Sequence, residues 1–295
     1  MILDANGRSF QYLRLSITDV CNYRCSYCLP NGYVEEAPRR FLDIDEIRHL
    51  VTGFAELGLW KVRLTGGEPT VRKDFAQIAA TVSAIPGIGK VATTTNGYQL
   101  AKHAQLWRDD GISAINISID SLDPVNFQRI TGMDHLPRVL KGVDAAEAAG
   151  FDDIKINTVL LKDLNHHELD RFLDFVKDRQ ISLRFIELME TGDNAAYFEK
   201  HHLCASTIIK ALVARGWQPV ARMIAAGPAQ EFSHPAYAGK IGIIAPYAKD
   251  FCQTCNRLRV TARGDLRLCL FGDGGHNLRH LLQSADQKNE LQRTV

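Results

Sequence analysis

The sequence predicts an α/β protein that folds as a partial (β/α)6 barrel of the TIM type, followed by a smaller C-terminal region. Short runs rich in β-branched residues alternate six times with amphipathic helical patterns. Nothing in the sequence indicates the reversal of strand order that a doubly wound sheet needs, although such a sheet remains the alternative. After about residue 218 the alternation gives way to prolines and short strand patterns.

Six segments have the pattern of buried parallel strands: residues 12–17, 61–65, 90–95, 114–119, 154–161 and 182–187. Helix patterns separate them. Asp43 followed by Glu46 predicts an N-cap and its capping box, and Asn165 followed by Glu168 predicts a second start of this kind. The apolar stripes behind these starts are Ile47, Leu50, Phe54 and Leu57, and then Leu169, Phe172, Leu173 and Val176. A later helix carries Ile208, Ile209, Leu212 and Val213.

We expect two regions, a barrel over residues 1–218 and a C-terminal region over residues 219–295. The C-terminal region begins with a proline-rich stretch and continues with a strand near residues 239–245. A hairpin then follows over residues 257–271, turned at Arg263 and Gly264.

Composition and charge exclude several function classes. The chain has 295 residues, 45% hydrophobic and 23% charged, which is enough for one large core. A net charge of +1 predicts neither a nucleic acid nor a membrane surface as partner. The first residues have no apolar signal region, and no apolar run approaches the roughly 20 residues of a membrane-spanning helix. We therefore expect a cytoplasmic protein.

Each predicted strand carries a polar motif that we expect at its end, and active sites of parallel α/β barrels lie at the C-terminal ends of the strands. In chain order the motifs are Thr18-Asp19 with the cysteines behind it, Gly66-Gly67-Glu68-Pro69, Thr94-Thr95-Asn96-Gly97, Ser118 with Asp120, Lys155 with Asn157, and Glu187 with Met189. Six motifs at six strands predict one shared cavity.

Three of the seven cysteines, Cys21, Cys25 and Cys28, lie within eight residues. Such grouping in a reducing compartment favours metal ligation over disulfides. One interpretation is a zinc site completed by a distant fourth ligand. The other is a [4Fe–4S] cluster, in which each thiolate bonds one iron and the fourth iron stays open for a ligand.

A second group consists of Cys252, Cys255 and Cys269. A zinc ribbon would need a second Cys-x2-Cys pair, so three thiolates again favour a cluster with one open iron. Between these cysteines, Arg257 and Arg259 point to one face of a strand, either as solvated arginines or as a phosphate site. Cys204 stands alone and is interpreted as a packing residue.

The pattern Cys-x3-Cys-x2-Cys, with the aromatic Tyr27 before the last cysteine, resembles the signature of the radical S-adenosylmethionine (radical SAM) superfamily. The resemblance implies that Cys21, Cys25 and Cys28 hold a first [4Fe–4S] cluster and that the backbone at Tyr27 meets the adenine. Gly66-Gly67-Glu68-Pro69 resembles the motif that receives the methionine ammonium, where carbonyls accept its hydrogen bonds and Glu68 adds negative charge.

Across nearly the whole chain, the segments YLRLSITDVCNYRCSYCLP, VRLTGGEP, TTNG, INISID, IKINTVL, RFIELMETG and FCQTCNRLR…LCLF resemble the GTP 3′,8-cyclase family of molybdenum cofactor biosynthesis. The resemblance implies a radical SAM lyase. A 5′-deoxyadenosyl radical would abstract hydrogen from ribose C3′ of GTP, and C3′ would then attack guanine C8. The product would be (8S)-3′,8-cyclo-7,8-dihydroguanosine 5′-triphosphate.

The same resemblance assigns site residues. Positions for S-adenosylmethionine are Tyr27, Gly67, Ser118 and Met189. Positions for GTP are Arg14, Arg63, Thr94, Lys155, Arg257, Leu258 and Arg259, of which Arg257 and Arg259 also assist catalysis. Cys252, Cys255 and Cys269 would hold a second, auxiliary [4Fe–4S] cluster. The residues themselves agree on charge, since Arg14, Arg63, Lys155, Arg257 and Arg259 are five cations, as a triphosphate would need.

The family resemblance also implies partners: GTP, an external one-electron donor, the downstream cyclic pyranopterin monophosphate synthase and a second copy in a homodimer. Family members end in a Gly-Gly tail that the ending LQRTV lacks, so we expect a missing C-terminal tail. Two other functions remain open. One is a radical SAM enzyme with an auxiliary cluster that modifies a peptide or another small molecule. The other is a zinc-stabilised binding protein without catalysis.

Overall fold

The six predicted parallel strands follow one another in sheet order. The computed structural model describes residues 2–4, 7–35, 40–191, 194–221, 227–249, 251–253, 255–269 and 275–295. The strands are β3 (Tyr12–Ser16), β4 (Lys61–Thr65), β5 (Lys90–Thr95), β6 (Ile112–Ser118), β7 (Asp153–Leu160) and β8 (Ser182–Glu187). Each pairs in parallel with the next, so the sheet has no reversal and the doubly wound alternative is wrong.

The C-terminal region extends this sheet at both edges. Strand β12 (Arg257–Val260) pairs in parallel with β3, and β11 (Lys240–Ile244) pairs in parallel with β8. Antiparallel strands continue outward, with β13 (Asp265–Arg267) and β14 (His276–Asn277) on one side and β10 (Gln230–Ser233) and β9 (Gln218–Pro219) on the other. Among the described residues β14 and β9 do not pair, so the barrel stays open, as expected for a partial barrel. A separate antiparallel sheet of two strands, β1 (Ile2–Leu3) and β2 (Ser9–Phe10), precedes the barrel in the chain.

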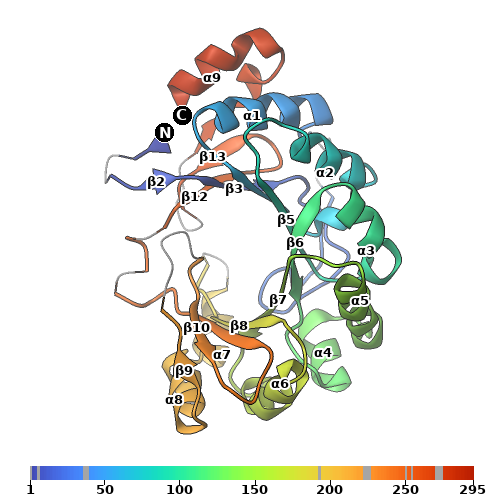
Figure 1. Cartoon of the computed structure of the whole chain (residues 1–295), viewed down its shortest axis with the longest axis vertical. Coiled ribbons are helices and arrows are strands. Elements are labelled where there is room, and N and C mark those ends of the chain that lie inside the picture. Colours follow the sequence, from blue (N-terminus) through green and yellow to red (C-terminus); the bar gives the residue numbers. More distant parts are fainter. Residues whose placement is uncertain are drawn as a thin grey trace.

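Helices cover the outside of the curved sheet and leave its interior open (Figure 1). They are α1 (Ile44–Glu56), α2 (Phe75–Ser83), α3 (Leu100–Asp109), α4 (Pro124–Thr131), α5 (Leu136–Ala148), α6 (Leu169–Val176), α7 (Ala195–His201), α8 (Ser206–Ala214) and α9 (Lys288–Thr294). The capping box of α1 is confirmed. Asp43 Oδ1 accepts from the Glu46 amide at 2.8 Å, and the Asp43 amide donates to Glu46 Oε2 at 2.9 Å.

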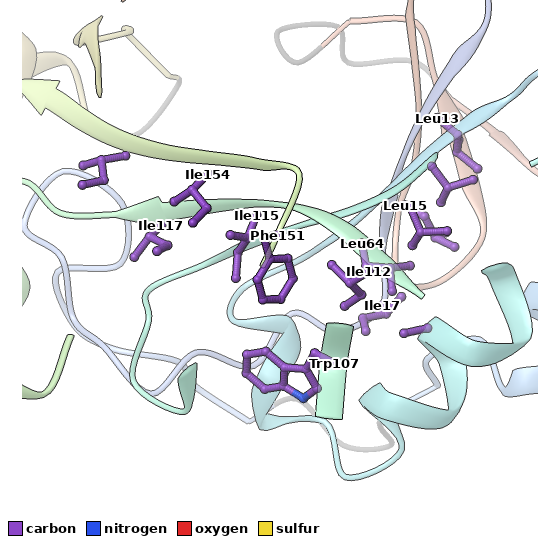
Figure 2. Close-up of a cluster of buried hydrophobic side chains, with 14 of the residues drawn as sticks. Leu13, Leu15, Ile17, Leu64, Trp107, Ile112, Ile115, Ile117, Phe151 and Ile154 are labelled. Carbon is purple, nitrogen blue, oxygen red and sulfur yellow. The ribbon is translucent and has the colours of Figure 1, made fainter. Parts of the chain in front are cut away.

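The hydrophobic core lies between the sheet and the helices. Figure 2 shows Leu13, Leu15 and Ile17 in this layer with Trp107 of α3, and all four side chains are buried. Successive strand residues point to opposite faces of the sheet. The residues of β3 that alternate with Leu13 and Leu15 therefore point to the barrel interior. In β3 these inward positions are Tyr12, Arg14 and Ser16. A core on the outer face thus leaves the inner face free for polar side chains.

The predicted capping box at Asn165 and Glu168 is wrong. A short 3-10 turn (His166–Glu168) precedes α6, and neither side chain caps it. Asn165 Nδ2 instead donates to the carbonyls of Asp120 and Val159, at 2.6 and 2.7 Å. The Glu168 carboxylate accepts from Ser121 Oγ at 2.7 Å. Both side chains are therefore used to hold the loops after β6 and β7 together.

Cys204 also departs from its prediction, because its side chain is exposed and does not pack into the core. The predicted hairpin is confirmed for the described residues. Gly264 at its turn has φ +94°, and β12 and β13 pair on either side.

The turn after β4 lies directly against the loop after β3. The Gly67 amide donates to the Thr18 carbonyl at 2.9 Å, and the Glu68 amide donates to the Val20 carbonyl at 2.8 Å. Gly66 has φ +149°, and a Cβ added there would lie 2.1 Å from the Thr18 carbonyl oxygen. Glycine is therefore required by both the backbone conformation and the close approach.

Gly66→Ala tests this close approach, with Gly150→Ala as its control. Gly150 also has a positive φ, +70°, but nothing lies within 4 Å of an added Cβ. We expect Gly150→Ala to lower the free energy of unfolding by about 1 kcal/mol and Gly66→Ala by at least about 3 kcal/mol. Thermal unfolding followed by circular dichroism measures both. Equal losses would show that the contact with Thr18 is easily relieved.

Candidate active site

The first cysteine group lies on the loop after β3, at the C-terminal ends of the parallel strands. Cys21 and Cys25 are half-buried and Cys28 is exposed. The Arg24 and Ser26 amides donate to the Thr131 and Ile130 carbonyls at the end of α4, at 3.0 and 2.8 Å. These two hydrogen bonds, one on each side of Cys25, hold the cysteine loop against the end of α4.

The three thiols influence one another. Burial raises the pKa of Cys21, and the Cys28 side chain raises it further. Burial also raises the pKa of Cys25 well above its usual value, and Asp120, Cys28 and Cys21 add to this shift. Three thiolates in this setting need a positive counter-charge, which an iron–sulfur centre supplies. In a [4Fe–4S] cluster each of the three cysteines bonds a different iron.

Glu68 supports the site differently from what the sequence suggested. Its side chain is 2% exposed and its carboxylate accepts four hydrogen bonds. The donors are the Thr70 amide and hydroxyl, the Thr95 hydroxyl and the Asn96 amide. Asn96 in turn donates through Nδ2 to Asn22 Oδ1 at 2.8 Å, within the cysteine loop. Glu68 thus ties the ends of β4 and β5 together.

A cavity of about 780 Å³ opens beside the cysteine loop. Tyr27 and Cys28 line it, together with Asn194 and Tyr197 from the start of α7. The Tyr27 hydroxyl donates to Asp120 Oδ2 at 2.8 Å, which anchors the aromatic residue to the end of β6. The other predicted S-adenosylmethionine positions, Gly67, Ser118 and Met189, do not line this cavity but lie at the same ends of β4, β6 and β8.

A second cavity, of about 510 Å³, lies inside the barrel. It brings together four of the five predicted cations, Arg14, Arg63, Lys155 and Arg257. Among the described residues its lining holds eight cations and two carboxylates. The cations are Arg14, Lys61, Arg63, Lys90, Lys155, Arg184, Lys240 and Arg257, and the carboxylates are Asp153 and Glu231. We call this space the cation cavity.

The position of the cation cavity corrects one expectation. Lys155 is the third residue of β7, and Arg14 and Arg63 are the middle residues of β3 and β4, so these cations do not lie at the C-terminal strand ends. They face the interior closer to the starts of the strands. The cysteine loop and the cation cavity therefore occupy different levels of the barrel.

The groups of the cation cavity that sequence reasoning missed include Tyr12, Lys61 and Arg184. The sequence did contain a signal for Tyr12 and Lys61. Tyr12 lies two residues before Arg14 and Lys61 two residues before Arg63, so each shares the inward face of its strand. Arg184, in β8, has the same inward orientation but no neighbour in the chain that marks it.

The cation cavity contains polar atoms that have no partner in the protein. Among the described residues, Arg14 Nε and Arg184 Nε are buried without an acceptor, and Asn116 Oδ1 and Asn157 Oδ1 are buried without a donor. Unsatisfied buried groups of this kind cost free energy. A polyanion with further hydrogen-bonding groups would satisfy both kinds of atom.

The pKa values in this part of the barrel also indicate that a bound anion would stabilise the cation cavity. Burial and the nearby Arg184 lower the pKa of Lys155 to about 8, despite its ion pair with Asp153. Burial, Arg14 and Arg257 lower the pKa of Arg259 to about 10. A bound anion would stabilise the protonated, charged forms of these side chains and so raise their pKa values.

Two further residues were predicted to bind GTP, Thr94 and Leu258. The Thr94 side chain acts indirectly, and the Leu258 side chain is not accessible to a ligand. Thr94 Oγ1 accepts from Arg63 Nη1 at 3.1 Å and so orients the guanidinium. The Leu258 side chain is 1% exposed and packs into the hydrophobic core, so only its backbone can reach a ligand.

The second cysteine group adjoins the cation cavity. Cys255 is half-buried, whereas Cys252 and Cys269 are exposed. Although burial favours the neutral thiol, Arg257 and Arg8 lower the pKa of Cys255. Cys255 and Cys269 both act electrostatically on Arg259. A thiolate beside arginines is a ready metal ligand, and residues 250, 254 and 270–274 of this region lie outside the described residues.

Within the described part of the chain, no helix is both long and apolar enough to cross a membrane.

Two family models match the chain. The model of the radical SAM superfamily matches residues 15–176, and the model Molybdenum Cofactor Synthesis C matches residues 181–295. Solved structures with a similar fold include SuiB of Streptococcus suis bound to S-adenosylmethionine, with a TM-score of 0.67 and 14% identity over 93% of this chain and 64% of that chain. Another is anSMEcpe with bound AdoMet and the Cp18Cys peptide, with a TM-score of 0.60 and 13% identity over 95% and 82% of the two chains.

Curated relatives are much more similar in sequence. The GTP 3′,8-cyclase of Klebsiella pneumoniae (strain 342) is 54% identical over 296 residues, which cover 100% of this chain and 90% of the relative. The GTP 3′,8-cyclase of Stenotrophomonas maltophilia (strain R551-3) is 56% identical over 98% of this chain and 89% of the relative. The chain therefore belongs to the radical SAM superfamily and, within it, to the GTP 3′,8-cyclase family.

Proposed function

We propose that this protein catalyses the radical cyclisation of GTP to (8S)-3′,8-cyclo-7,8-dihydroguanosine 5′-triphosphate, the first step of molybdenum cofactor biosynthesis. The observation that carries the proposal is the cation cavity, which lies inside a radical SAM barrel and adjoins a second three-cysteine group. The relatives that match the whole chain are named for this activity.

Cys21, Cys25 and Cys28 would hold the first [4Fe–4S] cluster, and Tyr27, Gly67, Ser118 and Met189 would surround S-adenosylmethionine. When bound, this pair supplies a 5′-deoxyadenosyl radical. The protein fixes the cysteine loop through α4 and through the bond between Tyr27 and Asp120. Holding the reactants in a fixed relation and away from solvent is the contribution that this barrel makes.

Arg14, Arg63 and Lys155 would bind the triphosphate, with Thr94 orienting Arg63. Arg257, Leu258 and Arg259 belong to the strand that follows Cys255. Arg257 and Arg259 would therefore contact both the nucleotide and the surroundings of the second cluster, which Cys252, Cys255 and Cys269 would hold. Their fixed positive charge would stabilise the cyclising nucleotide electrostatically.

We also propose the organisation and partners that follow from this activity. Residues 1–218 form the radical SAM unit and residues 219–295 form the auxiliary-cluster unit. An external donor supplies one electron, and cyclic pyranopterin monophosphate synthase takes the product. A homodimer is the proposed assembly. The cytoplasm is the proposed location, because grouped free thiolates persist in a reducing compartment.

A second candidate is modification of a peptide, since the fold is shared with SuiB bound to precursor peptide SuiA. The eight cations of the cation cavity argue for a polyanion instead. Anaerobic incubation with S-adenosylmethionine, a reductant and GTP, followed by product identification, separates the two. Formation of 5′-deoxyadenosine without a cyclised guanosine product would exclude the cyclase.

Single cysteine substitutions test the cluster ligands. Anaerobically prepared protein should contain about eight iron atoms per chain, because each [4Fe–4S] cluster holds four. We expect Cys21→Ser or Cys255→Ser to reduce this to about four, each through the loss of one cluster. Cys204→Ser is the matched control, since Cys204 is exposed and lies outside both groups. Zinc in place of iron, or no loss of iron in the two variants, would contradict the assignment.

Lys155→Met tests the triphosphate site. Removing one charged contact to a phosphate should weaken GTP binding about 10- to 100-fold, equivalent to about 1.5–3 kcal/mol. Anaerobic titration calorimetry measures the dissociation constant. Arg215→Met is the control, because Arg215 pairs with Asp170 on the outside of the barrel and should leave the affinity unchanged. Unchanged GTP affinity in Lys155→Met would place the triphosphate elsewhere.

A further inference from the structure

Tyr12 is a tyrosine that could act as an anion inside the cation cavity. It is the register partner of Lys61 in β4 on one side and of Arg257 in β12 on the other. Its hydroxyl oxygen accepts from Arg63 Nε at 2.5 Å, and Lys61 Nζ lies 4.8 Å from the centre of its ring. The Tyr12 side chain is therefore in direct contact with two cations of the cation cavity, and one of them, Arg63, would bind the triphosphate.

The charged groups that face Tyr12 come from its own strand and from both neighbouring strands. They are Arg14 of β3, Lys61 and Arg63 of β4, and Arg257 of β12. Lys155 and Arg184 lie across the cavity, and the two carboxylates of the lining already pair with them. Asp153 binds Lys155 and Glu231 contacts Arg184 at 3.4 Å. Asp153 also binds Lys90 at 3.3 Å and acts electrostatically on Lys61, so the carboxylates neutralise the cations around Tyr12 only in part.

This surrounding changes the acidity of Tyr12. Burial opposes ionisation, but Arg63, Arg14 and Lys61 outweigh it and lower the pKa of Tyr12 to about 7. A phenol usually has a pKa of about 10. As a phenolate, Tyr12 has no proton to donate and can only accept, which matches the N–H group that Arg63 Nε directs at it.

We propose that Tyr12 is a positioning residue that couples triphosphate binding to the uptake of a proton. In the free site its phenolate holds the Arg63 guanidinium in place. When the triphosphate enters, its oxygens become the counter-charge of Arg63 and the neighbouring cations. Tyr12 then takes a proton from solvent, forms its O–H bond and donates to a phosphate oxygen. The bond that breaks is the O–H or N–H bond of the hydronium ion or buffer acid that gives up this proton, and no other covalent bond changes. The inference rests on one part of the proposed function, the binding of a triphosphate in the cation cavity, and does not depend on the cyclisation itself.

The sign of the pH dependence follows from this exchange. The pKa of Tyr12 is low in the free site and returns towards about 10 in the complex, so the complex holds more protons than the free protein. Affinity is therefore greatest at low pH and falls as pH rises through 7. From a free-site pKa of about 7, the affinity should fall about fivefold between pH 7 and pH 8.

Lys155 could produce a similar dependence, because its pKa in the free site is about 8 and an anion would raise it. Lys155→Arg removes this second titration and keeps the positive charge, since arginine remains protonated. Tyr12 is therefore tested in the Lys155→Arg background, with Tyr12→Phe as the substitution. Tyr237→Phe is the matched control, because Tyr237 packs against Trp217 and His234 outside the cation cavity.

The experiment is titration calorimetry of inorganic tripolyphosphate into the anaerobic holoenzyme at pH 8. Two buffers with different ionisation enthalpies give the number of protons taken up. We expect Lys155→Arg and Lys155→Arg/Tyr237→Phe to take up about 0.9 proton more than Lys155→Arg/Tyr12→Phe. Protons carried by the ligand itself cancel in this comparison. Circular dichroism and iron content establish that each variant is folded and loaded.

An absorbance measurement tests the protonation of Tyr12 independently of the calorimetry. Tripolyphosphate does not absorb in the near ultraviolet, so its addition should remove a tyrosinate band from the parent protein and none from the Tyr12→Phe variant.

Equal proton uptake with and without Tyr12, or no loss of a tyrosinate band, would overturn the proposal and leave the cyclase function standing. Failure of tripolyphosphate to bind at all would overturn it too, because the triphosphate would then lie elsewhere. In that case cyclisation of GTP by the same preparation shows whether the proposed function survives. If GTP is not cyclised although tripolyphosphate binds with the expected proton uptake, the function fails and the Tyr12 inference stands.

Discussion

Repulsion between like charges is the constraint on which the interior of this barrel depends. Eight cations and two carboxylates among the described residues face one cavity, and such a set stays together only if the surrounding scaffold holds it. Strand pairing fixes Tyr12, Lys61 and Arg257 side by side, while Leu13, Leu15 and Ile17 anchor the same sheet to its helices on the opposite face. Burial and this positive field together lower the pKa values of Lys155 and Arg259, whereas for Tyr12 the field lowers the pKa against the opposing effect of burial.

The two cysteine groups meet opposite electrostatic surroundings. Asp120 and neighbouring thiols raise the pKa of Cys25 beyond the effect of burial, so a thiolate there would need the positive charge of a metal centre. Arg257 and Arg8 lower the pKa of Cys255, so this member of the second group favours the thiolate. Arg257 would therefore have two uses, since the charge that would hold a triphosphate also stabilises the Cys255 thiolate beside it. This shared use explains why the Cys255 loop leads directly into β12.

Local patterns predicted most of the fold. The capping box at Asp43 was found because its two hydrogen bonds join residues three apart. The pattern at Asn165 and Glu168 looked the same but failed, because both side chains bind loops more than 40 residues away in the chain. Lys155 was placed at a strand end, yet it lies near the start of β7. A strand pattern gives the face on which a residue lies, but it does not give the level at which neighbouring strands align.

The sequence by itself determined the order of the six strands, the two cysteine groups and the family, because each depends on short spacings within the chain. Only the tertiary structure decided which side chains share the cation cavity. Arg184 joins it through the pairing of β8 with β7, and Glu68 becomes a structural acceptor through contacts with Thr95 and Asn96. The acidity of Tyr12 likewise depends on Arg63, 51 residues away. Electrostatic surroundings are sums over neighbours in space, and strand pairing brings those neighbours together.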